Sequence, residues 1–213
     1  MKFSIPSQFF ISGTDTMVGK TVVSAILTIG LEATYWKPVQ SGLAALSDTE
    51  FIKKSCELSA ERVLPEVYRL ARPLSPHLSA KLEDRRIALE EVQLPIGVGR
   101  LIVEGAGGLL VPLNEYALII DLVAHLGLPV LLVARSTLGT INHTLLSVEA
   151  LRSRNIDIVG VVMNGSLNPD NKAAIEHYAK VPVVAELPPL AALDRSTLAQ
   201  AFKDYFGDLC VND

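Results

Sequence analysis

The chain has 213 residues, of which 49% are apolar and 20% charged, and its 19 Lys and Arg against 23 Asp and Glu give a net charge of −4. This charge argues against broad affinity for nucleic acid, which needs an excess of Lys and Arg on one face. No apolar run reaches the roughly 20 residues that span a bilayer, so neither nucleic acid nor a membrane is expected as a partner. The length favours a single domain over residues 1–213 with a large core.

The first residues do not have the long apolar stretch of a signal peptide, because Pro6, Ser7 and Gln8 interrupt it. Cys56 and Cys210 form neither a metal-binding nor a redox motif, and both are expected as ordinary thiols in a reducing compartment. We therefore expect a cytoplasmic protein.

Short apolar segments alternate along the chain with longer segments of helical periodicity. The predicted strands are Phe9–Ser12, Tyr35–Lys37, Leu101–Glu104, Val130–Ala134, Val159–Asn164 and Val183–Glu186. The predicted helices are Lys20–Glu32, Asp48–Glu57, Ala117–His125, Ile141–Ser153, Asn171–Lys180 and Ser196–Phe206. This order predicts an α/β fold: a single-domain, P-loop NTPase-like, doubly wound and mainly parallel sheet with helices on both faces. The Pro-rich segment 64–76 is predicted to wrap the surface.

A glycine-rich segment, Gly-Thr-Asp-Thr-Met-Val-Gly-Lys-Thr at 13–21, joins the first predicted strand to the first helix. Backbone N–H groups of such a loop, with the helix N-terminus behind them, bind phosphate. Lys20 can reach the outer phosphates, and the Thr21 hydroxyl can ligate Mg²⁺. The general pattern has four residues between its first glycine and Gly-Lys-Thr, whereas five separate Gly13 from Gly19, so a plain glycine turn is the alternative. The segment predicts binding of a nucleoside triphosphate.

Two charged residues follow neighbouring predicted strands, at the sheet edge where such folds bind ligands. Glu104, followed by Gly105-Ala106-Gly107-Gly108, is expected to be the second partner of Mg²⁺; the alternative is a strand-end carboxylate beside a flexible turn. Lys37 is expected to point into the phosphate cleft and neutralise an anionic group, with the Ser41 hydroxyl nearby. A surface lysine before a proline is the alternative for Lys37.

Two further polar residues have both a plain and a functional interpretation. Asp48 stands where a short loop becomes a helix, so it is an N-terminal helix residue or a further Mg²⁺ ligand. Asn164 ends a Val-rich strand and is expected either in an Asn-Gly turn or at an adenine edge. The four histidines have no metal-binding spacing, and none is assigned to catalysis.

Taken together, these motifs resemble those of the dethiobiotin synthetases, over nearly the whole chain. Besides the loop at 13–21, the motifs are Trp-Lys-Pro-Val-Gln-Ser-Gly at 36–42, Ser-Pro-His at 75–77, Val-Glu-Gly-Ala-Gly-Gly at 103–108, Leu-Gly-Thr-Ile-Asn-His at 138–143 and Val-Val-Met-Asn at 161–164. Six motifs in the order of that family are more specific than any one of them. The five-residue gap between Gly13 and Gly19 is also a feature of that family.

The resemblance implies an ATP-dependent ligase of biotin synthesis, with Mg²⁺ as cofactor, which closes 7,8-diaminononanoate and CO₂ into dethiobiotin. The implied route runs through an N-carbamate and a carbamic–phosphoric mixed anhydride and releases ADP and phosphate. Carbamate and triphosphate are both anionic, and two like charges about 4 Å apart repel by about 4 kcal/mol at an effective dielectric constant of about 20. Lys20, Lys37 and Mg²⁺ would supply the countercharge.

The resemblance also implies roles for individual residues. It implies Lys37 and Lys20 as catalytic residues, and Thr21, Asp48 and Glu104 as Mg²⁺ ligands. For ATP it implies Thr16, Met17, Val18, Gly19, Lys20 and Thr21 at the phosphates, Glu104, Gly105, Ala106 and Gly107 beside the γ-phosphate, and Asn164, Gly165, Pro188, Pro189 and Leu190 at the adenine. For the diamine it implies Thr16 and Ser41, with Leu138, Gly139 and Asn142 of a partner subunit at its carboxylate, hence a homodimer.

The chain departs from the family pattern at two of these positions. Met17 stands where some members carry an acidic residue, and Pro189 replaces an aromatic residue that some members place near the base. The match of Asp48 depends on the Ser-Asp pair at 47–48 alone.

Three other functions are compatible with a loop of this type. A ParA/MinD-like ATPase switch would carry a lysine early in the loop, but residues 14–16 are Thr-Asp-Thr, and no basic patch or amphipathic anchor is evident. A cobyrinate-synthase-like ATP domain would accompany a glutaminase domain, for which 213 residues leave no room. An inactive binding paralogue would not be expected to retain Lys20, Lys37 and Glu104.

Overall fold

The computed structural model describes residues 3–44 and 46–212. Its centre is a seven-stranded sheet in the order β10-β9-β8-β2-β7-β3-β5, in which every neighbouring pair is parallel. The strands are β2 (Gln8–Gly13), β3 (Thr34–Trp36), β5 (Val63–Leu64), β7 (Leu101–Gly108), β8 (Val130–Arg135), β9 (Ile158–Asn164) and β10 (Val183–Leu187). The predicted fold class is confirmed.

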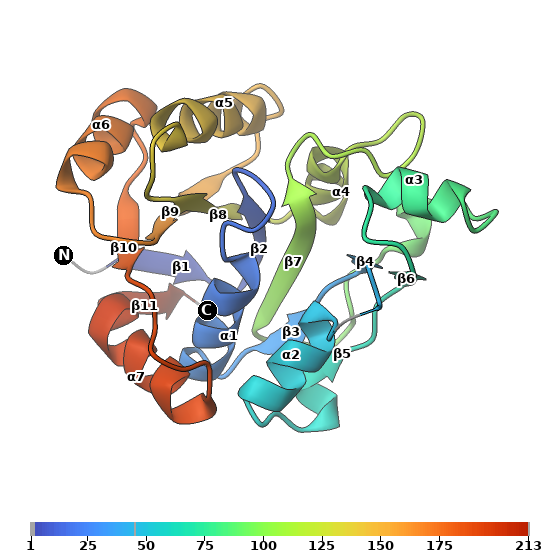
Figure 1. Ribbon diagram of the computed structural model, residues 1–213, viewed down its shortest axis with the longest axis horizontal. Helices are drawn as coiled ribbons and strands as arrows, with labels where there is room; N and C mark the ends of the chain where they lie inside the picture. The colour runs from blue at the N-terminus through green and yellow to red at the C-terminus, as the bar shows by residue number, and fades with distance from the viewer. Residues whose placement is uncertain (1–2, 45, 213) are drawn as a thin grey trace.

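Helices cover both faces of this sheet (Figure 1). The apolar residues of α1 (Lys20–Gly30), α2 (Asp48–Ser55) and α7 (Arg195–Phe206) pack into one core cluster. Those of α3 (Pro76–Lys81), α4 (Ile119–Leu126), α5 (Thr140–Arg152) and α6 (Pro169–Ala179) pack into the other. The sheet separates the two clusters, so the molecule has three layers.

Strand β8 shows why the apolar runs form a sheet that is buried on both sides. Val130 and Leu132 point into one core cluster, and Leu131 and Val133 point into the other. All four are fully buried. Because successive side chains of a strand point to opposite faces, only a continuous apolar run can fill both clusters.

Several short elements were not predicted. In the Pro-rich segment 64–76, predicted only to wrap the surface, strand β6 (Tyr68–Leu70) pairs with β4 (Val39–Ser41). Near the two chain ends, β1 (Phe3–Pro6) pairs in parallel with β11 (Leu209–Asn212), apart from the central sheet (Figure 1). Short 3₁₀ turns lie at Ala60–Arg62 and Leu89–Glu91. Elements of two to four residues carry too little periodicity to be predicted and are held by their long-range pairing.

The end of β7 also differs from the prediction. Glu104 was expected to end the strand, but β7 continues through the glycines to Gly108, which pairs with Gly13 of β2. A Cβ on Gly105 would lie 2.7 Å from the Phe10 ring, so this close packing requires a glycine. Glu104 is therefore held within a strand and does not begin a flexible turn.

Among residues 3–44 and 46–212, no helix combines the length and the apolar character that crossing a bilayer requires.

Candidate active site

The loop between β2 and α1 is closed by Gly19, which caps α1 in the left-handed conformation at φ 97°. A Cβ on Gly19 would lie 2.0 Å from Nδ2 of Asn164, so no side chain fits there. The Asn164 amide at the end of β9 donates a hydrogen bond of 2.9 Å to the Val18 carbonyl. Met17, at φ 58°, is 96% exposed at the tip of the loop. Asn164 thus supports the back of the loop, a role that sequence reasoning did not assign to it.

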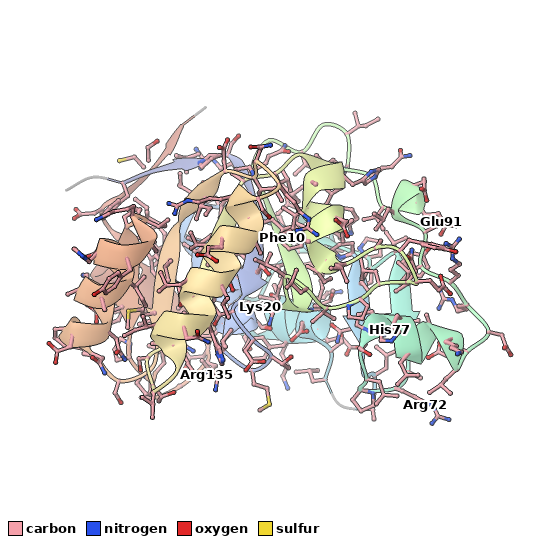
Figure 2. All side chains as sticks on the ribbon, turned by 90° about the horizontal axis from the view of Figure 1, so that it is seen from above. Phe10, Lys20, Arg72, His77, Glu91 and Arg135 are labelled. Atoms are coloured by element: carbon pink, nitrogen blue, oxygen red, sulfur yellow. The ribbon has the colours of Figure 1, made fainter. Side chains whose placement is uncertain are left out.

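Lys20, the first residue of α1, folds back over this loop. Its Nζ donates to the Asp15 carbonyl at 3.2 Å, and the residue is only 7% exposed. Burial lowers the pKa of Lys20 below its ordinary value; Glu104 opposes this shift, while the ammonium of Lys37 adds to it. Figure 2 shows Lys20 well inside the molecule, whereas Arg72 reaches its outside.

Three oxygen atoms from distant parts of the chain meet beside Lys20. The Thr21 hydroxyl on α1 lies 2.8 Å from Oδ1 of Asp48, the first residue of α2. The same hydroxyl lies 2.9 Å from Oε1 of Glu104 on β7. Ser47 caps α2 in a capping box with Glu50, which fixes where the helix and its Asp48 begin.

Lys37, which follows β3, is the counter-ion of both carboxylates. Its Nζ lies 2.8 Å from Oδ2 of Asp48 and 3.1 Å from Oε1 of Glu104, and it donates to the Gly105 carbonyl at 3.1 Å. Burial alone would lower the pKa of Lys37, but the two carboxylates outweigh burial and hold that pKa above its ordinary value. Burial would likewise raise the pKa of Asp48, but Lys37 holds it below its ordinary value. Lys37 is therefore a buried, charged ammonium.

These residues line a single cavity of about 690 Å³. The predicted site residues on its wall are Thr16, Met17, Gly19, Lys20, Thr21, Lys37, Ser41, Asp48, Glu104, Ala106 and Gly107. The cavity is also lined by residues that sequence reasoning missed: Val22, Gln40, Pro73, Leu74, Ser75, Pro76 and Val111. The Ser-Pro-His motif at 75–77 was the available signal for part of this second set.

The other predicted site residues lie outside this wall. Val18 is buried in the core, and Gly105 contributes only its carbonyl to Lys37. Gly165 follows β9, and its backbone N–H donates to the Leu187 carbonyl at the end of β10; residues 188–190 continue from there. At the start of α5, Leu138 is fully exposed, Gly139 caps the helix and Asn142 is exposed.

Two polar contacts around the site were also not predicted. The Tyr35 hydroxyl donates to Oε2 of Glu104 at 3.1 Å. Burial, and then the Glu104 charge, raise the pKa of Tyr35 well above its ordinary value. Arg135, at the end of β8, forms an ion pair with Asp15, which also accepts the Thr16 backbone N–H. Both contacts connect residues far apart in sequence, so no local sequence pattern predicts them.

The donor set at Thr21 fits a magnesium ion. The three converging oxygens share one hydroxyl proton, which cannot satisfy both carboxylates at once. Mg²⁺ is usually held by one or two carboxylates together with substrate phosphates. In the described part of the chain, no group of three or more His, Cys, Asp and Glu side chains could hold a metal by itself. The hydroxyl and the two carboxylates are oxygen donors of the kind that Mg²⁺ accepts from a protein.

Two curated proteins that are similar to this chain over most of both lengths share one name. Residues 7–197 match a family described as AAA domain. The ATP-dependent dethiobiotin synthetase BioD of Brucella ovis is 48% identical over 200 residues, which are 94% of this chain and 94% of that protein. The protein of the same name from Paramagnetospirillum magneticum is 50% identical over 190 residues, 89% of this chain and 92% of that protein.

One further relative is a longer protein, and one solved structure shares the fold without close sequence similarity. The biotin biosynthesis bifunctional protein BioCD of Bordetella avium is 50% identical over 89% of this chain, but the match spans 41% of that longer protein. A crystal structure of a ParA family ATPase from Chlorobium tepidum superposes with a TM-score of 0.52 at 10% identity, covering 91% of this chain and 97% of that one. This last likeness concerns the fold alone. The chain belongs to the family of the ATP-dependent dethiobiotin synthetases.

Proposed function

We propose that this protein closes 7,8-diaminononanoate and CO₂ into dethiobiotin at the expense of ATP. The names of its relatives support ATP-dependent dethiobiotin synthesis, and the two substrates are those that the family resemblance implies. The observation that carries the proposal is the convergence of Lys20, Lys37, Thr21, Asp48 and Glu104 on one cavity. An anionic carbamate and a triphosphate can approach each other only where positive charge is concentrated, and two ammonium groups line this cavity.

In the proposed reaction, one amine of the substrate first takes up CO₂ as a carbamate. A carbamate oxygen attacks the γ-phosphorus of ATP, the bond to the β-phosphate oxygen breaks, and ADP leaves. The second amine then attacks the carbonyl carbon of the mixed anhydride, and phosphate leaves as the cyclic urea forms. We assign the protein a positioning and electrostatic role in these steps, without a covalent intermediate.

The phosphate loop would bind the triphosphate through backbone N–H groups of 16–21, with Lys20 at the outer phosphates. Lys37 would neutralise the charge that builds up on the transferred phosphoryl group. Thr21, Asp48 and Glu104 would hold Mg²⁺, which would supply positive charge against the phosphates. The contacts of the Lys37 ammonium with both carboxylates support a role beside the transferred phosphoryl group.

For the rest of ATP and the diamine, we propose contacts that the family resemblance implies. Asn164, Gly165 and the 188–190 segment would flank the adenine, because they leave the neighbouring strands β9 and β10 at the same sheet edge as the loop. Ser41 and Thr16 would face the diamine, and Ala106 and Gly107 would lie between it and the γ-phosphate. From the lining of the cavity, and not from the resemblance, we add that the apolar chain of the diamine would contact Pro73, Leu74 and Val111.

We further propose that the protein acts as a homodimer. Leu138 at the start of α5 is fully exposed, and Leu146 on the same helix is 56% exposed. A second hollow of about 280 Å³ lies between Leu146 and the loop residues 14–16. A second copy that covered this surface would bring its own residues 138–142 toward the diamine. Light scattering after size-exclusion chromatography should give twice the monomer mass, and a monomeric active enzyme would contradict this part of the proposal.

The deciding experiment supplies the purified protein with ATP, Mg²⁺, bicarbonate and 7,8-diaminononanoate and identifies the product by mass. Dethiobiotin and ADP should appear in equal amounts, and ¹³C from labelled bicarbonate should enter the urea carbonyl. Omission of the diamine should abolish both products. A Lys53→Ala variant, altered at an exposed lysine of α2, should match the wild type. Release of ADP by the wild type without formation of dethiobiotin would refute the proposed reaction.

A further inference from the structure

We infer that Tyr35 is a positioning residue, whose hydroxyl fixes the Glu104 carboxylate so that Oε1 faces Thr21. This inference rests on the proposed metal site. The hydroxyl donates to Oε2 of Glu104 at 3.1 Å, which is the opposite oxygen from the one that meets Thr21. Both oxygens of the carboxylate are thereby engaged, one on each side.

The sheet register places the two side chains together. Tyr35 of β3 pairs with Ile102 of β7, and both belong to the core cluster beneath α1 and α2. Glu104 stands two residues after Ile102, so its side chain leaves the same face of the sheet. A long aromatic side chain reaches such a diagonal neighbour across two strands.

Burial makes this contact strong and exclusive. Tyr35 is 0% exposed and Glu104 is 1% exposed, so water does not compete for either group. Within residues 3–44 and 46–212, the Tyr35 hydroxyl is the hydrogen-bond donor to Oε2, while Oε1 meets Thr21 and Lys37. A carboxylate this deep needs a donor at each oxygen, because an unpaired buried acceptor is costly.

Tyr35 acts through Glu104 and does not itself reach the ligands. It is not among the described residues that line the 690 Å³ cavity, whereas Glu104 is. Without the hydroxyl, the carboxylate could turn about its last torsion and lose the orientation of Oε1. Loss of an outer hydrogen-bond partner of a metal ligand typically lowers metal affinity or activity by about 10- to 100-fold.

The test compares Tyr35→Phe with a matched control, Tyr68→Phe. The control removes another buried tyrosine hydroxyl that donates to a carboxylate, that of Glu91, away from the cavity. Calorimetry would measure ADP affinity with Mg²⁺ and with EDTA. For Tyr35→Phe we expect the gain in affinity from Mg²⁺ to fall about tenfold, with the affinity in EDTA within about twofold of wild type. Tyr68→Phe should match wild type in both conditions.

A double-mutant cycle with Glu104→Gln separates positioning from general damage to the fold. If Tyr35 acts through Glu104, Tyr35→Phe should have no further effect on the Mg²⁺ dependence in the Glu104→Gln background. The inference would be overturned if Tyr35→Phe had equal effects in the wild-type and Glu104→Gln backgrounds, or if the single variant kept the Mg²⁺ dependence of wild type. Either result would leave the proposed metal site standing. If the ADP affinity of the wild-type protein were the same with and without Mg²⁺, the proposed metal site would be overturned as well.

Discussion

Replacement of Lys37 by alanine is the most direct perturbation of the charge arrangement in the cavity. The Lys37 ammonium is 2.8 Å from Asp48 and 3.1 Å from Glu104, and the residue is 3% exposed. Its removal leaves two carboxylates facing one another across the Thr21 hydroxyl, without a side-chain ammonium between them. The variant should therefore affect the unliganded protein and the reaction in different ways.

In the unliganded protein, the cost follows from these distances. At an effective dielectric constant of about 20, each contact is worth about 5–6 kcal/mol of Coulomb energy, most of which offsets the desolvation of the charges. Breaking a buried pair by removing one partner costs about 3–5 kcal/mol. Because the Asp48 side chain is 32% exposed, we expect the lower end of this range. Lys37→Ala should therefore lower the free energy of unfolding by about 3 kcal/mol.

The pH dependence of this loss has a definite sign. Lys37 holds the pKa of Asp48 in the folded state below its ordinary value of 3.8. The corresponding stability is present above the unfolded pKa and is lost as the pH falls through the folded pKa. The stability difference between wild type and Lys37→Ala should thus be full near pH 7 and should shrink below about pH 4.

For the reaction, loss of one preorganised electrostatic group should lower kcat by at least about 100-fold, while ATP affinity changes little. Urea denaturation at several pH values, calorimetry with ATP and the mass-detected dethiobiotin assay measure the three quantities. The matched control is Lys53→Ala, which removes an exposed lysine of α2. A kcat within threefold of wild type, with the stability loss present, would refute the role of Lys37 in catalysis.

Three further outcomes are expected. Glu104→Gln should weaken Mg²⁺ dependence and dethiobiotin formation together, and an unchanged Mg²⁺ titration would reject Glu104 as a ligand. Gly19→Ala should abolish nucleotide binding measured by calorimetry, because the residue sits at φ 97° and its new Cβ would lie 2.0 Å from Asn164. In the native protein at pH 8, a thiol reagent should modify exposed Cys210 rapidly and buried Cys56 only after denaturation, because burial raises the pKa of Cys56 to about 11. Rapid modification of two thiols would contradict this burial.

Gly99→Ala is the matched control for Gly19→Ala. Gly99 has no other heavy atom within 4 Å of where a Cβ would be, and its φ lies outside the left-handed region. Nucleotide affinity should be unchanged in this variant. If Gly19→Ala also bound nucleotide normally, the packing of Asn164 against the loop would not matter for binding.

Local sequence patterns predicted the fold class and most of the residues that line the 690 Å³ cavity with charged or hydroxyl groups. The continuous apolar run of Val130–Ala134 already indicates a strand buried on both faces, and the glycine loop before Lys20 already indicates a phosphate site. The proximity of Glu104 to Thr21 was also predictable, because parallel strands end at one edge of the sheet. For Asp48, the Ser-x-x-Glu pattern at 47–50 was an available signal of the helix start.

Other features depend on contacts between residues that are distant in sequence. Strands β4 and β6, of three residues each, pair with one another. The chain that follows β6 then brings Ser75 and Pro76 to the wall of the cavity. Asn164 was predicted either in an Asn-Gly turn or at the adenine, and the structure shows that its amide donates to the Val18 carbonyl, 146 positions away. The adenine contact stays a prediction.

Periodicity and motif thus predicted the longer strands and helices, and which of their ends meet at the candidate site. Only the tertiary structure decided that Tyr35 holds Glu104, that Arg135 pairs with Asp15, and that Lys37 bridges two carboxylates. The physical reason is that propensity acts between neighbours in sequence, whereas a buried polar group must find its partner wherever strand order and register place one.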